Sequence, residues 1–294
     1  MTVSSVLFTI AGAAWLVLAI GVVTRLAEAP RSVLAELRDP VLSPFWSLVW
    51  LAGMPLSIGV APYSLTAAEV WLIVCVAGIV ANALYIVPLW IADRSAPPRF
   101  HPGYILPTIA GGVLPAQVAA ALRLSALAWV CLAVGAASCL ALAPVMVRRL
   151  ARSWPVPAAL TPTLAISLAP PAVGSNAYLD LRGMRADGVA YALLAVAVAT
   201  ALAQIPLISR YLRLPFGPSV WGFAFPVAAI AGCAVHWLQI LNPPGQAIYA
   251  GLTCAATSAL IGALALRTLL AAMPSWRAPV NHNDAREELS VQRT

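Results

Sequence analysis

Charged residues are scarce in this sequence, and lysine is missing altogether. Asp, Glu, Lys and Arg make up 9% of the 294 residues, whereas a soluble domain carries about 25%. All 17 basic residues are Arg, and they lie in loops, tails or, like Arg267, near the end of an apolar run. The composition excludes an ordinary soluble domain, and the net charge of +7 does not indicate a nucleic-acid partner.

Motifs for catalysis and for metal binding are missing as well. The sequence contains no HExxH and no GxSxG, and its three His are scattered at His101, His236 and His282. The five Cys lie singly in apolar runs, without the spacing of metal ligands. We therefore predict no enzyme, no metal site and no cofactor. The Cys are interpreted as small core residues, and His236 as an interfacial, structurally satisfied residue.

Long apolar runs dominate what is present, with 62% of the residues hydrophobic. A spanning helix needs about 20 such residues. The sequence predicts nine spans of this length, at roughly 4–24, 43–61, 67–91, 103–120, 124–147, 160–179, 187–208, 217–238 and 246–270. The first run has no basic n-region and no cleavage site, so it is interpreted as a span and not as a signal peptide. Residues 1–273 form one transmembrane pore domain in this prediction, and 274–294 a disordered cytoplasmic tail.

The arginines predict the orientation in the membrane. With the N-terminus outside, 14 of them fall in inside loops and the C-terminal end. The outside loops then hold only Arg123, Arg182 and Arg185. This split follows the positive-inside rule. It predicts a multi-pass protein of the cell membrane with the N-terminus outside and the C-terminus in the cytoplasm.

Prolines recur in phase in alternate spans. Three pairs are each eight residues apart, and the pairs begin 55 and 56 residues apart: Pro107 and Pro115, Pro162 and Pro170, Pro218 and Pro226. The second span has a looser pair, Pro44 and Pro55. A fixed period indicates a repeated unit, here a hairpin of one proline-bearing helix and one regular helix. The first span is then the second helix of a fifth hairpin, and its proline-bearing partner is absent from the sequence.

The deeper proline of each repeat is expected to kink its helix: Pro55, Pro115, Pro170 and Pro226. Irregular backbone within a membrane is tolerated where protein buries it or where it lines a watery cavity. The prolines therefore favour a set of helices around a conduit. The alternative is that they only shape helix packing.

Three segments carry a resemblance to a known family: "AELRDPVLSPFWSLV", "YILPTIAGGVLPA" and "WGFAFPVAAIA". Over about residues 5–270 the sequence resembles the tellurite-resistance/dicarboxylate transporter family, that of the TehA-like and slow-type anion channels. The resemblance implies a homotrimer whose protomers have ten helices in five hairpins around a pore. It also implies transport of small anions or organic acids, with a phenylalanine plug. This chain departs from the pattern by lacking the first helix and by having Asp39 before Pro40 where a His is expected.

The residues just before the deeper prolines are the predicted pore-lining set: Met54, Leu114, Ala169 and Phe225. Phe225 is the only aromatic among them and is the predicted gate, a choice that the resemblance supports. Phe223 is the competing pore-lining aromatic, because residues two apart point in nearly opposite directions on a helix. The alternative for Phe225 is a core aromatic that packs between helices.

The acidic residues sit near span ends rather than at their centres. Buried ionisable residues mark proton relays and voltage sensors, so their absence favours passive conduction. The sequence predicts an all-α membrane protein that moves small inorganic anions through its conduit. Two alternatives stay open. One is a secondary carrier or exporter of C4-dicarboxylates, sulfite or tellurite, and the other is a membrane scaffold that transports nothing.

Overall fold

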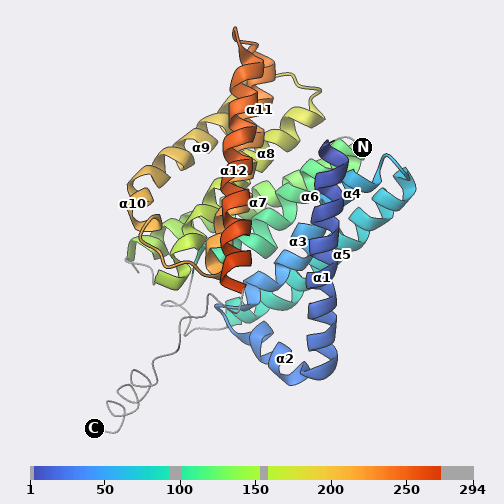
Figure 1. Cartoon of the computed structure of the whole chain (residues 1–294), viewed down its shortest axis with the longest axis vertical. Helices are drawn as coiled ribbons and strands as arrows, with labels where there is room; N and C mark the ends of the chain where they lie inside the picture. The colour runs from blue at the N-terminus through green and yellow to red at the C-terminus, as the bar shows by residue number, and fades with distance from the viewer. Residues whose placement is uncertain (1–2, 93–100, 153–157, 273–294) are drawn as a thin grey trace.

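The computed structural model describes residues 3–92, 101–152 and 158–272, and in these ranges the regular elements are all helical (Figure 1). The predicted tail, 274–294, lies outside the described residues. Five long helices are regular: α1 (Val3–Glu28), α5 (Leu65–Ala92), α7 (Ser125–Arg152), α9 (Gly188–Gln204) and α12 (Gln246–Ala272). Their apolar composition and length suit a bilayer, where every backbone polar group must be bonded within the helix.

The predicted spans all fall on helical segments. Eight helices in the described part of the chain are long and apolar enough to cross a membrane. The predicted sixth span, 160–179, is not one of these eight, although it lies in the continuous helical stretch Ala158–Leu181. Its apolar character is interrupted by prolines and by buried polar residues such as Ser175 and Asn176.

Each proline-bearing span is built from segments of different helical pitch. The tight or wide segments come first and α-helix follows, as these bounds show: η1 (Ser43–Ser47), α3 (Leu48–Gly53) and α4 (Leu56–Val60); η3 (Pro102–Ile105), η4 (Leu106–Ala110) and α6 (Gly111–Ala121); η5 (Ala158–Leu168) and α8 (Ala169–Leu181); η7 (Pro218–Phe223) and α11 (Ala224–Leu241). We call these four spans the inner helices. The segment η4 is a π-helix, and η1, η3, η5 and η7 are 3-10 helices.

The packing of the helices reproduces the predicted hairpins. The inner helices contact one another in chain order, since α3 and α4 pack against α6, α6 against α8, and α8 against α11. Each regular helix packs against the inner helix that precedes it: α5 against α3 and α4, α7 against α6, α9 against α8 and α12 against α11. Helix α1 packs against α3 and α4 and has no buried residue. The prediction of an all-α membrane fold made of repeated helical hairpins is confirmed.

Short elements connect these layers. Helix α2 (Pro30–Arg38) buries Val33 and leads from α1 into η1, and Arg25 forms an ion pair with Glu36 that links α1 to α2. The segments η6 (Ile205–Leu207) and α10 (Ile208–Tyr211) extend α9. In Figure 1, α1 (dark blue) and α12 (orange-red) run along the outside of the bundle, in agreement with their exposed side chains.

Helices α6 and α7 pack backbone against backbone. A Cβ atom added to Gly112 would lie 2.4 Å from the Cα of Gly135. Two glycines facing each other let the two backbones touch, as small residues do in membrane helix pairs. This contact holds together the hairpin that the fourth and fifth predicted spans form.

Candidate conduit between the inner helices

Three of the four deeper prolines occupy positions where an α-helix begins. Pro55 is the N-cap of α4, Pro170 is the second residue of α8 and Pro226 the third residue of α11. The N–H groups in the first turn of an α-helix have no acceptor within that helix, so a proline there removes no α-helical hydrogen bond. Pro115 differs, because it lies in the interior of α6. Three of the four prolines therefore mark the start of an α-helix within the span.

Side chains from the regular helices donate hydrogen bonds to backbone carbonyls of the inner helices. The indole N–H groups of Trp71 and Trp15 donate to the carbonyls of Gly53 (2.8 Å) and Val49 (2.9 Å). On the opposite flank the Gln204 amide donates to the carbonyl of Leu164 at 3.4 Å. Carbonyls that leave the α-helical pattern are costly in an apolar environment. Here the bundle itself supplies donors to these carbonyls.

The predicted pore-lining residues divide into two groups. Met54, Leu114 and Ala169 lie in one continuous hydrophobic core and are 0%, 5% and 1% exposed. Phe225 is 40% exposed. Phe223 is half-buried and packs edge-to-face on Tyr211, with ring centroids 4.8 Å apart. The structure thus brings three of the predicted residues together and leaves the predicted gate on the surface of the described chain.

The deeper prolines are more uniform in their burial than the predicted pore-lining residues are. Pro115, Pro170 and Pro226 are buried, and Pro55 is half-buried. Buried prolines on three successive inner helices agree with a common interface and not with a lipid-facing surface. The role of the prolines in a conduit stays a prediction.

The buried polar side chains of the inner helices are small or neutral. In the described ranges they are Ser43, Ser47, Ser57, His101, Thr161, Thr163, Ser175 and Asn176. Ser175 accepts a hydrogen bond from the Trp237 indole at 3.3 Å, which joins α8 to α11. The Oδ1 atom of Asn176 is buried without a donor among the described residues. These groups could replace part of the hydration shell of an ion without holding it tightly.

His101 stands at the start of η3 and is 1% exposed. Its Nδ1 accepts the N–H of Gly103 at 3.1 Å, and its Nε2 lies 3.1 Å from the carbonyl of Val41 and donates to it. The ring stacks on Phe45 with centroids 5.5 Å apart. Burial lowers the pKa of His101 to about 4, which outweighs the raising effects of the Val41 carbonyl and of Asp39. A neutral imidazole therefore joins the loop before η1 to the start of the next inner helix.

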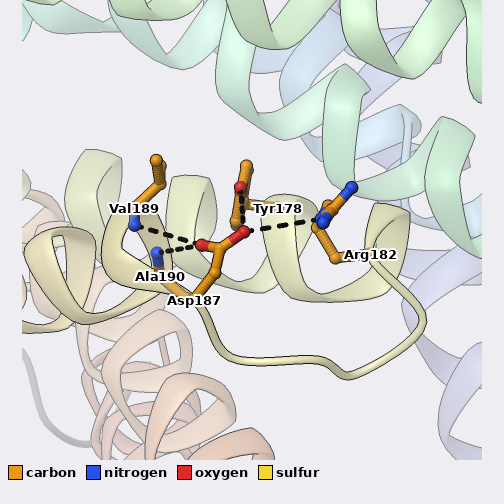
Figure 2. A network of polar contacts seen from close by, with 5 residues as sticks. All are labelled: Tyr178, Arg182, Asp187, Val189 and Ala190. Carbon is orange, nitrogen blue, oxygen red and sulfur yellow. Dashed lines mark hydrogen bonds and ion pairs between the residues drawn. The ribbon is translucent and has the colours of Figure 1, made fainter.

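The opposite end of the inner helices carries a charged network (Figure 2). The Asp187 carboxylate accepts the Tyr178 hydroxyl at 2.7 Å and pairs with Arg182 at 3.5 Å. It also accepts the N–H groups of Val189 and Ala190, both at 3.1 Å, and so caps α9. The Tyr178 hydrogen bond is the main reason that the pKa of Asp187 is lowered. The network fixes the turn between α8 and α9.

A second polar pair lies at the same end. His236 of α11 has its Nε2 3.1 Å from Asp180 Oδ1 of α8 and its Nδ1 2.9 Å from the carbonyl of Gly232. The prediction of a structurally satisfied His236 agrees with these contacts. The partner could not be foreseen from the sequence, because Asp180 and His236 are 56 residues apart. The His101 contacts could not be foreseen either, since their only local signal is a His-Pro-Gly at the start of a span.

The fold defines a polytopic helical membrane protein whose proline-bearing helices contact one another in chain order. Comparison with protein families then gives a match to the voltage-dependent anion channel family (SLAC1) over residues 1–269. The chain belongs to this family, which confirms the predicted membership. Its members are anion channels and transporters, so this chain is assigned to anion transport in the membrane. A comparison with curated proteins finds no match.

Proposed function

We propose that the protein lets small inorganic anions cross the membrane passively through a conduit between its inner helices. The observation that carries this proposal is the family match, which covers all four inner helices. The arrangement supports it, because the inner helices contact one another in order and each regular helix packs against the inner helix that precedes it. Passive conduction needs sites that are weak enough to release the ion.

The buried polar groups favour a channel over a coupled carrier. In the described part of the chain the buried polar side chains include hydroxyls, one amide and one imidazole, but no carboxylate and no guanidinium. A carrier driven by protons commonly holds an ionisable relay within its spans. The secondary carrier of C4-dicarboxylates, sulfite or tellurite is therefore the second candidate.

Flux through the purified protein in proteoliposomes tests this proposal. Chloride, nitrate, sulfite and malate are compared under voltage clamp, with empty vesicles as the control. A channel gives large passive currents that follow the anion gradient, whereas a carrier gives small, saturable flux. Flux of malate alone, or saturable flux of any of the four anions, would favour the second candidate. The absence of flux for all four would leave a membrane scaffold.

Phe225 is proposed as the gate of this conduit. It directly precedes Pro226 at the start of α11, where the backbone changes from 3-10 to α-helix. Its exposed fraction of 40% speaks against the alternative of a core aromatic. The competitor Phe223 has a packing partner in Tyr211. A hydrophobic side chain in a narrow passage can close it by excluding water.

Phe225→Ala with Phe223→Ala as its matched control tests the gate. The loss of a plug is expected to raise anion flux about tenfold or more, the change that removal of ~1.4 kcal/mol from a barrier gives. Phe223→Ala should leave flux unchanged and should lower thermal stability, because the Tyr211 contact is lost. Equal flux in the two variants at normal folded yield would contradict the gate.

Orientation and assembly complete the proposal. The arginine distribution supports an outside N-terminus and a cytoplasmic C-terminus, and a reporter fused after Thr294 tests this assignment. The resemblance to the family supports a homotrimer. The exposed apolar surface of α1 and α12 is available to lipid or to neighbouring protomers. The mass of the detergent-solubilised protein, measured by light scattering, tests the trimer.

A further inference from the structure

The second histidine of the described chain, His236, lies between two hydrogen-bond acceptors. Its Nδ1 is 2.9 Å from the carbonyl oxygen of Gly232, one turn earlier in α11. Its Nε2 is 3.1 Å from Oδ1 of Asp180, the penultimate residue of α8. These two contacts involve both ring nitrogens, so the ring joins two neighbouring inner helices.

The hydrogen-bond inventory of this pair requires an extra proton. A carbonyl oxygen only accepts, and so does an ionised carboxylate. A neutral imidazole has a single N–H and can donate to one of the two oxygens but not to both. Both contacts become hydrogen bonds if the ring carries two protons, or if Asp180 carries one and donates it to Nε2. In either case the pair of side chains holds one proton and has no net charge.

The pair lies where such a proton can exchange with water. The His236 and Asp180 side chains are 24% and 25% exposed, so they are neither sealed in the core nor fully solvated. They stand at the end of the inner helices opposite to His101, where α8 leads into the turn before α9. Partial burial reduces the screening of a charge at this position.

The surroundings leave Asp180 as the charged partner of His236. On α8 and the following turn, Tyr178 and Arg182 are bonded to Asp187. Helix α9 contributes Tyr191, whose ring packs on Trp237 with centroids 5.1 Å apart. Helix α12 carries Tyr249 and Cys254 in its first half and a single charged residue, Arg267, near its far end.

We propose that Asp180 and His236 form a proton-binding site that makes anion passage depend on pH. The inference rests on the proposed function, because it needs an anion conduit between α8 and α11. With the proton bound, the pair is neutral and both hydrogen bonds hold the two helices together. Without it, a neutral His236 beside an ionised Asp180 leaves one negative charge at the end of the conduit. A negative charge at a conduit mouth lowers the local anion concentration, so flux falls as pH rises.

Two substitutions change the charge of the pair in opposite ways. One keeps the negative charge at every pH, and the other removes it. His236→Gln keeps a donor for Asp180 but cannot hold the proton, so the negative charge is present at every pH. Flux through this variant should stay at the high-pH level of the wild type. Asp180→Asn removes the negative charge, and flux should stay at or above the low-pH level. Asp187→Asn is the matched control, since Asn still caps a helix, and its flux should follow the wild-type pH profile.

The experiment measures chloride flux in proteoliposomes from pH 5 to 9, with the same pH on both sides of the membrane. The wild type is expected to lose flux about tenfold across its titration. The His236→Gln profile should be flat, and the Asp180→Asn flux should at no pH fall below the low-pH level of the wild type. A wild-type profile that is flat, or that both variants reproduce, overturns the coupling. A wild type that carries no anion at any pH contradicts the proposed function, and with it the coupling.

Nitrogen-15 NMR of the histidine rings tests the proton site without any transport. The full chain is labelled at its three histidines, and the His236 signal is assigned as the one that His236→Gln removes. The site is supported if both ring nitrogens are protonated below the transition and the ring is neutral above it. It is also supported if Asp180 carries the proton below the transition. A neutral His236 beside an ionised Asp180 throughout the range overturns it. If His236→Gln does not fold, Asp180→Asn identifies the signal by its shift.

Discussion

The two ends of the inner helices use histidine in opposite ways. At the start of η3, His101 is sealed from solvent and meets one donor and one acceptor, the N–H of Gly103 and the carbonyl of Val41. At the end of α11, His236 is partly exposed and meets two acceptors. The first set of partners suits a neutral ring, and the second suits a ring that shares an additional proton.

The hydrogen-bond partners of an imidazole therefore decide its protonation state more than its place in the sequence does. His101 precedes an apolar run and His236 lies near the end of one, so both look like span-end residues in the sequence. His101 acts as a fixed link between two loops, because burial disfavours its charged form. His236 joins two helices through its contact with the Asp180 carboxylate. One end of the bundle is therefore insensitive to pH near neutrality, and the other end is expected to respond to it.

The largest expected effect is from His101→Ala. The change removes a buried ring, its contact with Phe45 and both hydrogen bonds. It leaves the N–H of Gly103 and the carbonyl of Val41 without their partner. We expect the free energy of unfolding to fall by about 3–5 kcal/mol, measured by thermal unfolding in detergent. His236→Ala is the comparison at the other end, and an equal or larger loss there would contradict the contrast in burial.

The next effect is the pH dependence of stability that His101 contributes. Its pKa is about 4 in the folded protein, below the ordinary value of 6.5. The unfolded chain therefore binds more protons between these values, and stability falls as pH falls from 6.5 to 4. The loss attributable to this group is about 3 kcal/mol. Unfolding curves of wild type and His101→Gln should converge toward pH 4, and parallel curves would refute the assignment.

A smaller effect is expected at the turn of Figure 2. Asp187→Ala removes the cap of α9 together with the Tyr178 and Arg182 contacts, so the melting temperature should fall. Asp187→Asn keeps the cap and should fall less. The pKa of Asp187 is lowered, so its contribution is present at neutral pH and is lost as pH falls through that lowered pKa. If the difference in melting temperature between the wild type and Asp187→Ala does not shrink in acid, this assignment is contradicted.

The smallest effects concern two equivalent turns at the same end. Arg123, between α6 and α7, and Gly183, between α8 and α9, have φ values of 63° and 61°. The left-handed conformation costs a residue with a Cβ about 1–2 kcal/mol. Gly183→Ala should therefore destabilise by about 1 kcal/mol, and Arg123→Gly should stabilise by less than that. Changes of the same sign in the two melting temperatures would show that the turns are not equivalent.

Much of the fold could be predicted because it depends on local composition. The spans follow from runs of apolar residues, and the alternate inner helices follow from the phase of Pro107, Pro162 and Pro218. The conformation at the deeper prolines was harder to predict. Proline restricts its own residue and the one before it, but whether the helix kinks or restarts depends on the donors nearby, such as Trp71 for the Gly53 carbonyl.

The candidate site could be predicted only in part. Met54, Leu114 and Ala169 were grouped by their place before a proline, and the structure puts them in one core. Phe225 has the same place in its repeat, yet it is exposed. A position in a repeat determines a position along the helix, whereas the neighbouring helices determine what covers the side chain.

The sequence by itself determined the membrane environment, the approximate extent of the spans and the hairpin order. Hydropathy and proline affect the conformation of only the few residues around them, so these features can be predicted from short stretches of sequence. Only the tertiary structure decided which histidine is neutral and which one shares a proton. His101 and Val41 are 60 residues apart, and His236 and Asp180 are 56 apart. Contacts over such separations depend on how the helices pack, and it is these contacts that set the charge of each ring.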